Sequence, residues 1–73
     1  MNQQEIQMIF AVETFEKEDL LNPNLAQEYI TSAERREFTA SQFLLNSDYA
    51  RLARMLAAWD RKVAQALNEY HNK

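Results

Sequence analysis

Apolar residues in the last third of the chain recur at alternating spacings of three and four residues. They are Tyr49, Leu52, Leu56, Trp59, Val63, Ala66 and Tyr70. This is the spacing of the a and d positions of a coiled coil, so it predicts one long helix over residues 48–71 with an unbroken apolar stripe. Ser47 is a good N-cap for this helix, and Asp48 would lie favourably at the positive end of its dipole.

A smaller stripe with the same kind of spacing predicts a second helix over residues 23–45. Its positions are Ala26, Ile30, Ala33, Glu37, Ala40 and Leu44. Small alanine side chains allow two helix backbones to approach closely. Because the link that ends at Ser47 is short, we expect an antiparallel hairpin with Trp59 facing the second helix. Pro23 suits the first position of that helix, and Asn22 suits its cap.

The N-terminal segment holds an unbroken run of five apolar residues, residues 8–12. A strand here would have no partner, since no other segment alternates convincingly, so we predict a helix over residues 3–20. A helical wheel gives this helix two apolar stripes on roughly opposite sides. We expect the stripe of Met8, Val12 and Phe15 to cover the hairpin. The other stripe, which contains Ile6, Ile9 and Phe10, is then left for another chain.

Two more apolar residues lie off the stripe of the second predicted helix, Phe38 and Leu45. With the surplus stripe of the first helix they complete a predicted partner-binding surface. Its residues are Ile6, Ile9, Phe10, Phe38 and Leu45. The acids Glu16, Glu18 and Asp19 would crowd the last turn of the first helix, where the dipole disfavours anions. Either a basic partner offsets them, or they form a solvated, frayed end.

Composition narrows the class of protein. The chain has no Gly and one Pro, which favours a few long elements, and we predict one all-α domain over residues 1–73. A domain of this size buries only about 60% of its unfolded surface and usually gains stability from disulfides, a metal or a partner. There is no Cys, and His71 is the only His. We therefore expect no metal site and no cofactor, and a protein partner remains.

The formal net charge of −3 is unevenly spread. Residues 1–37 carry eight acids and three bases, and residues 38–73 carry three acids and five bases. These opposed halves could attract each other within one molecule or between two. An acidic chain is not expected to bind nucleic acid in general.

The bases of the third predicted helix share one face, and they are Arg51, Arg54, Arg61 and Lys62. This face is either solvated, a phosphate contact or a strip for an acidic protein partner. Glu37, on the stripe of the second helix, is either an edge residue at the surface or a partner of Arg51, Arg54 or a basic group on another chain.

Catalytic and membrane patterns are not visible. No nucleophile has a base nearby in the sequence pattern, and the carboxylate pairs at helical spacing, such as Glu34 with Glu37 or Glu13 with Glu16, are typical of solvated surface. No apolar stretch approaches the roughly 20 residues of a membrane-spanning helix. The opening "MNQQEIQ" lacks the basic flank and apolar core of a signal peptide. We expect a cytoplasmic protein that is not an enzyme.

The segment "YARLARMLAAWDRKVAQAL" resembles the second helix of the YscE-type proteins of bacterial type III secretion, mainly over residues 49–67. The resemblance rests on these positions: Tyr49, Leu52, Ala58, Trp59, Asp60, Val63 and Ala64. It implies a helical-hairpin co-chaperone that performs no chemistry. Such proteins pair with a tetratricopeptide-like chaperone, and together the two hold the needle-forming subunit as a soluble monomer until export.

Two functions are thus open. The first is a non-catalytic protein-interaction module, a co-chaperone or adaptor with a helical partner, which could form a homo-oligomer when alone. The alternative is a small phage- or plasmid-type regulator that binds nucleic acid through the basic face that begins at Arg51.

Overall fold

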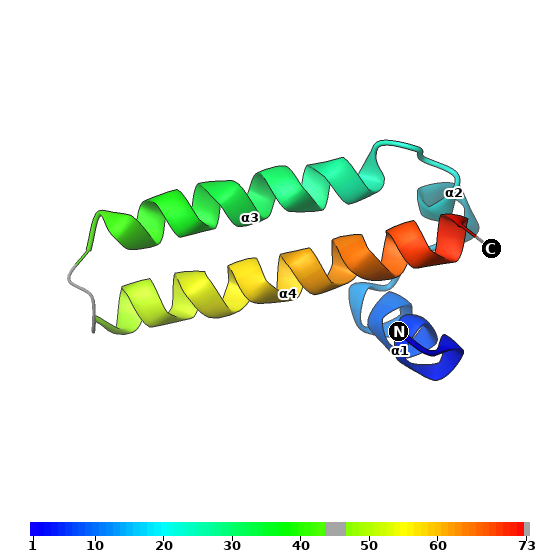
Figure 1. Cartoon of the computed structure of the whole chain (residues 1–73), viewed down its shortest axis with the longest axis horizontal. Helices are drawn as coiled ribbons and strands as arrows, with labels where there is room; N and C mark the ends of the chain where they lie inside the picture. The colour runs from blue at the N-terminus through cyan, green and yellow to red at the C-terminus, as the bar shows by residue number, and fades with distance from the viewer. Residues whose placement is uncertain (44–46, 73) are drawn as a thin grey trace.

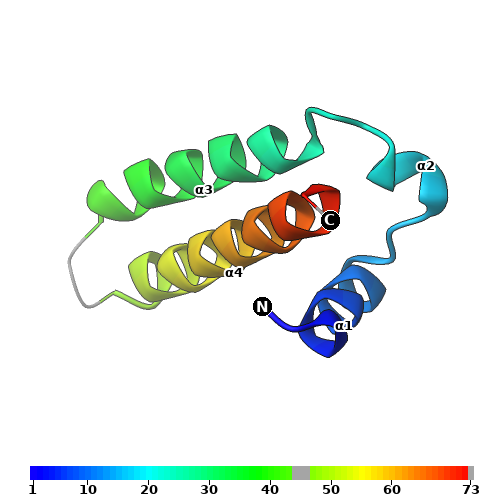
Figure 2. The ribbon, with the colours of Figure 1, turned by 45° about the vertical axis from the view of Figure 1, so that its right-hand side comes forward.

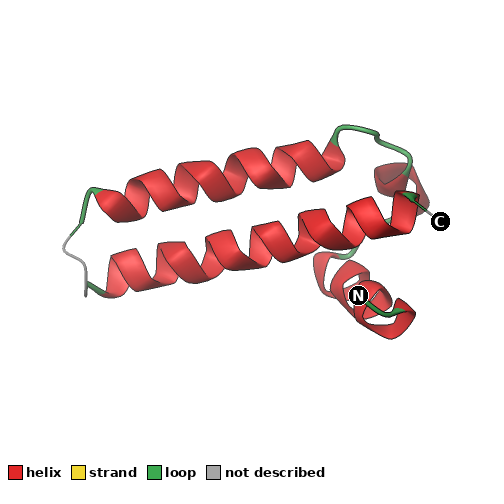
Figure 3. Cartoon of the chain, viewed as in Figure 1, coloured by secondary structure: helices red, strands yellow, loops and turns green. Residues whose placement is uncertain are grey.

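The computed structural model describes residues 1–43 and 47–72. These residues form only helices, with no strand among them (Figures 1 and 3). The helices are α1 (Gln3–Glu13), α2 (Lys17–Leu20), α3 (Leu25–Ser41) and α4 (Asp48–His71). The prediction of an all-α fold is confirmed. Leu44 and Leu45, which the sequence placed on a stripe and on the partner-binding surface, lie outside the described residues.

The hairpin is built from α3 and α4, which run antiparallel and side by side in both ribbon views (Figures 1 and 2). The bounds of α4 are those predicted, and the Ser47 hydroxyl accepts a hydrogen bond from the Ala50 N–H at 3.1 Å. Helix α3 is shorter than predicted at both ends, since the sequence placed it over residues 23–45 and it runs from Leu25 to Ser41. The Asn22 side chain accepts from the Asn24 N–H at 2.9 Å, which closes a local turn around Pro23 and delays the helix to Leu25.

The N-terminal segment forms two helices, so the prediction of one helix over residues 3–20 is wrong. Thr14 adopts the left-handed conformation, with φ of 56°, and its N–H donates to the Ala11 carbonyl at 3.1 Å. This C-cap ends α1, although a non-glycine residue is uncommon there. The chain turns, and α2 begins after Glu16, whose N–H donates to Asp19 at 2.8 Å.

The break also corrects the expectation for the acidic residues near it. Glu16, Glu18 and Asp19 do not crowd the last turn of a long helix. They lie at the cap and in the first turn of α2, where backbone N–H groups and the helix dipole favour carboxylates. No basic partner is needed to explain their position.

Alanines form the seam of the hairpin. The buried residues on α3 are Ala33 and Ala40, as predicted, and three buried alanines of α4 repeat every seven residues, at Ala50, Ala57 and Ala64. Such small residues allow the two helices to pack closely along their length. The expectation that the bulky stripe of α4 faces α3 is therefore wrong.

The core lies where α1 crosses the C-terminal half of α4 (Figure 1). Its buried residues are Ile6, Ile9, Val63, Ala66 and Leu67. Ile6 and Ile9 are 1% and 4% exposed, whereas Met8 and Val12 are 64% and 62% exposed. The two stripes of the first helix are thus exchanged relative to the prediction, and Ile6 and Ile9 are not available to a partner.

Phe15 gives the physical reason for this exchange. Beyond the break at Thr14 it no longer continues the stripe of Met8 and Val12. Its N–H donates to the Phe10 carbonyl at 3.0 Å, and its ring packs edge-on against Phe10, with centroids 5.5 Å apart, and against Tyr29 at 5.8 Å. The large aromatic side chain therefore adds to the side of Ile6, Ile9 and Phe10, and that side is buried.

Candidate protein-binding face

One apolar surface of α4 is left uncovered. Its residues are Tyr49, Leu52, Met55 and Leu56, exposed by 72%, 54%, 70% and 40%; we call them the exposed α4 face. Farther along the same stripe, Val63 and Ala66 are buried beneath α1. Figures 1 and 2 agree that α1 lies against the C-terminal half of α4, drawn in orange, and does not reach the N-terminal half, drawn in yellow, which packs on α3 by its other side. The stripe is thus occupied over one half only.

The sequence of α4 explains why these side chains remain outside. Around this half of the helix, small and large residues are segregated. Ala50 and Ala57 face α3 and are buried, and Leu52 and Leu56 lie on the side of the bulky stripe. A seam of alanines brings the helices together without covering the larger side chains beside it. Phe43 adds one more exposed ring, since it stacks on Tyr49 with centroids 5.5 Å apart.

Basic side chains border the exposed α4 face on the edge away from α3. On a helical wheel Arg51 and Lys62 fall beside Met55, and Lys62 follows Met55 by one heptad. Arg51 is paired with Asp48, Nη2 to Oδ1 at 2.6 Å, and both groups are exposed. Among the described residues, Lys62 has no ion pair.

A second uncovered apolar strip lies on the outer side of α1. Met8 and Val12 are four residues apart, so they form one ridge, and Glu5 lies one turn before Met8 on the same side. All three side chains are exposed. This strip carries an acidic border, in contrast to the basic border of the exposed α4 face.

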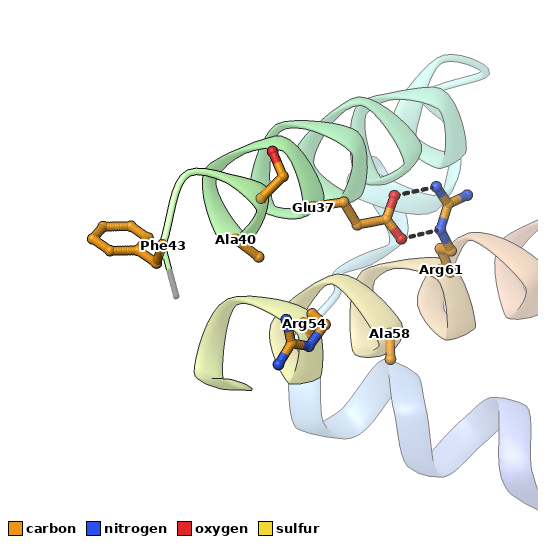
Figure 4. A pocket seen from close by; sticks show the side chains of 7 residues that line it. Glu37, Ala40, Phe43, Arg54, Ala58 and Arg61 are labelled. Atoms are coloured by element: carbon orange, nitrogen blue, oxygen red, sulfur yellow. Dashed lines mark hydrogen bonds and ion pairs between the residues drawn. The ribbon is translucent and has the colours of Figure 1, made fainter. Parts of the chain in front are cut away.

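A separate groove lies between α3 and α4 on another side of the hairpin (Figure 4). Across it, Arg61 donates from Nε and Nη2 to both carboxylate oxygens of Glu37, at 3.1 and 2.6 Å. The hydrogen bond from Arg61 lowers the pKa of Glu37 and raises the pKa of Arg61 itself. Glu37 therefore has a basic partner within its own chain, although the sequence had offered Arg51 and Arg54 rather than Arg61.

Polar side chains at the junction of three helices tie those helices together. The carboxylate of Glu13, on α1, accepts from Trp59 Nε1 on α4 at 2.9 Å and from the hydroxyl of Tyr29 on α3. Burial, and then the hydrogen bond to Glu13, raise the pKa of Tyr29. Trp59 thus lies at this junction and not in the alanine seam.

Asp60 links the two hairpin helices in a similar way. It is buried on α4, accepts from the Ser32 hydroxyl at 2.8 Å and pairs with Arg36 Nε at 3.3 Å, both on α3. A buried carboxylate needs such partners. Within the described part of the chain, no group of three or more His, Cys, Asp or Glu is placed to hold a metal ion.

The predicted partner-binding residues do not form one surface. Ile6 and Ile9 lie in the core, and Phe10 is half-buried against Tyr70, with ring centroids 5.3 Å apart. Phe38 is exposed, but it lies in the last turn of α3. Figure 1 shows that this end of α3 is the one away from α1. Leu45 lies outside the described residues.

Sequence reasoning missed the exposed α4 face because it assigned the whole stripe to the hairpin. A usable signal was present in the predicted lengths: even a helix over residues 3–20 is shorter than one over residues 48–71, so it could not cover the whole stripe.

The fold and the exposed face together define a small helical hairpin with a short helix packed at one end. Comparisons of the chain with protein-family models, with curated proteins and with solved structures found no match. None of the helices in the described residues combines the length and apolar character needed to cross a membrane.

Proposed function

We propose that this chain is a non-catalytic protein-interaction module that binds a helix of a partner protein on the exposed α4 face. The observation that carries this proposal is that the apolar stripe of α4 is covered by a helix over one half and exposed over the other. Its C-terminal half, at Val63 and Ala66, already binds a helix, α1. The N-terminal half continues the same spacing of large apolar side chains, which suits a second helix of the same kind.

The chemistry of the face supports this role. Fully burying a leucine side chain that was fully exposed contributes about 1.5–3 kcal/mol. Leu52 and Leu56 are 54% and 40% exposed, so each leaves part of that contribution for a partner to supply. Met55 adds a flexible side chain that can adapt to an irregular partner surface. Clustered exposure of such residues on a monomer marks interaction surfaces more often than it marks ordinary surface.

The resemblance of residues 49–67 to YscE-type proteins makes the proposal more specific. On that basis the chain is a cytoplasmic co-chaperone, its partner is a tetratricopeptide-like chaperone, and the pair keeps a type III secretion needle subunit soluble. Tetratricopeptide repeats present helices, which is the kind of surface that the exposed α4 face fits. The nucleic-acid alternative has less support, because Arg51 and Arg61 are already paired with carboxylates of the chain.

Co-expression tests this function. The chain would be produced with the tetratricopeptide-like chaperone and the needle subunit encoded nearest to its gene, and complexes would be measured by size exclusion with mass detection. We expect a soluble complex that Leu52→Glu abolishes, because a carboxylate cannot be desolvated in an apolar interface without a partner charge. Leu21→Glu is the matched control, since Leu21 is 79% exposed and lies outside the face. A complex that forms equally well with Leu52→Glu would refute the proposed role of the face.

A further inference from the structure

The chain exposes two apolar ridges whose spacing matches. One is Met8 and Val12 on α1, and the other is Leu52 and Leu56 on α4, each pair four residues apart. Rows of side chains spaced by four residues are the ridges that pack into the grooves of a neighbouring helix. Each ridge is therefore shaped to meet another helix.

The two ridges cannot meet within one molecule. The inner side of α1 is held on α4 by Ile6 and Ile9, which are buried in the core. Met8 and Val12 project from the other side of α1 and are exposed. Contact between the ridges therefore needs a second chain.

Charge decides which ridges pair. Glu5 borders the α1 ridge, whereas Lys62, which has no ion pair among the described residues, continues the edge of the exposed α4 face one heptad beyond Met55. Arg51 lies on the same edge but is already paired with Asp48. Pairing the α4 faces of two chains would bring basic edges together, which is unfavourable. Pairing α1 of one chain with α4 of the other brings Glu5 toward a basic edge, in line with the acidic excess of residues 1–37 and the basic excess of residues 38–73.

We propose that two copies of this chain form a closed two-fold dimer in which the α1 ridge of each copy packs on the exposed α4 face of the other. In a two-fold interface every contact occurs twice, so both ridges of both chains are covered. The inference deepens the proposed function, because the dimer occupies the same face as the partner. The free chain is then a dimer, and the partner protein displaces the second copy.

Charge reversal tests the pairing directly. In the Glu5→Lys variant, a lysine borders the α1 ridge and faces the lysine on the edge of the α4 face. In the Lys62→Glu variant, a glutamate on the edge of the α4 face opposes Glu5. Each variant alone should dimerise about tenfold more weakly than wild type, because two exposed ion pairs per dimer become repulsive. An equimolar mixture of the two variants should recover dimerisation, since both contacts are again between opposite charges. Sedimentation velocity at low ionic strength measures all of these states.

Three further variants keep the test specific. Glu18→Lys makes the same charge change as Glu5→Lys on the exposed side of α2, and it should leave the dimer unchanged. Leu52→Glu and Met55→Glu should both give monomers with wild-type helicity by circular dichroism. If either variant fails to fold, the other still tests the face.

Several outcomes would overturn the dimer. The first is a wild-type chain that stays monomeric at high micromolar concentration. The second is a mixture of the two charge variants that stays monomeric. The third is a Glu18→Lys variant that weakens association as much as Glu5→Lys does. None of them touches the proposed function, which is measured by partner binding. Conversely, a partner complex indifferent to Leu52→Glu would refute that function and leave the dimer standing.

Discussion

Single side chains set the position of α1 on the hairpin. The Glu13 carboxylate accepts from Tyr29 on α3 and from Trp59 on α4, so one residue connects all three helices. It does so next to Thr14, the residue whose left-handed conformation ends α1. The two neighbours together determine where the first helix stops and which elements it is joined to.

Tyr29 predicts a dependence of stability on alkaline pH. Its pKa is raised above the ordinary value of 10.0, mainly by burial and then by its hydrogen bond to Glu13. Above pH 10 the unfolded chain releases this proton while the folded chain retains it, so the free energy of unfolding should fall as pH rises. At neutral pH, Tyr29→Phe should cost about 1 kcal/mol for the lost hydrogen bond.

Urea melts of wild type and Tyr29→Phe at pH 7 and above pH 10 check this. The gap between the two proteins should narrow in alkali, because only the wild type has the hydroxyl at this position. A gap that stays constant would show that Tyr29 does not contribute to the alkaline loss of stability.

Among the elements, α4 is the one with two separate roles. Its alanine side packs on α3, and its bulky side packs on α1 or remains exposed. Because alanine is small, the α3–α4 seam depends on close approach and has no room for larger side chains.

The seam can be tested with neighbouring alanines. Ala57 is buried and Ala58 is exposed, one position apart on the same helix. Ala57→Leu should destabilise the protein by about 1–3 kcal/mol or more, because the added volume separates the two helices. Ala58→Leu should change the free energy of unfolding by less than about 0.5 kcal/mol. Thermal and urea unfolding of both variants measure the difference, and equal effects would contradict the alanine seam.

The molecule as a whole has two unlike ends. At one end α1, α2 and parts of α3 and α4 surround the cluster of Ile6, Ile9 and Leu67. At the other end the described residues belong to α3, α4 and the hairpin connection (Figure 2). Alanines join the two helices there, and the exposed α4 face lies beside them. Its longest extent is 41 Å against 22 and 19 Å in the other directions.

This asymmetry predicts unequal local stability. Amide hydrogens of the described residues near the start of α4, such as Arg54, should exchange faster than those near Leu67, because few buried apolar side chains support that end. Hydrogen exchange read by mass spectrometry at several protein concentrations measures this. Protection around Leu52 should rise with concentration if a second copy covers the face, and uniform exchange along α4 would contradict the two-ended description.

Much of the fold was predictable from spacing alone. The seven-residue repeat and the cap at Ser47 were enough to place α4 over residues 48–71, and the alanines of α3 were assigned correctly to the hairpin. These features depend on local backbone preference and on the period of one helix, which a sequence displays directly.

The tertiary structure decided which apolar side faces which neighbour. A helical period fixes the angle between two stripes, but it does not say which stripe is buried when both are apolar. The choice depended on one backbone conformation at Thr14, which turned Phe15 toward Phe10 and added its area to the side of Ile6. The same break shortened α1, so that α1 reaches along α4 only as far as Trp59, which Glu13 contacts, and Leu52 was left outside. Which side is buried depends on the total apolar area that several elements remove from water together, and the sequence of one segment does not reveal that total.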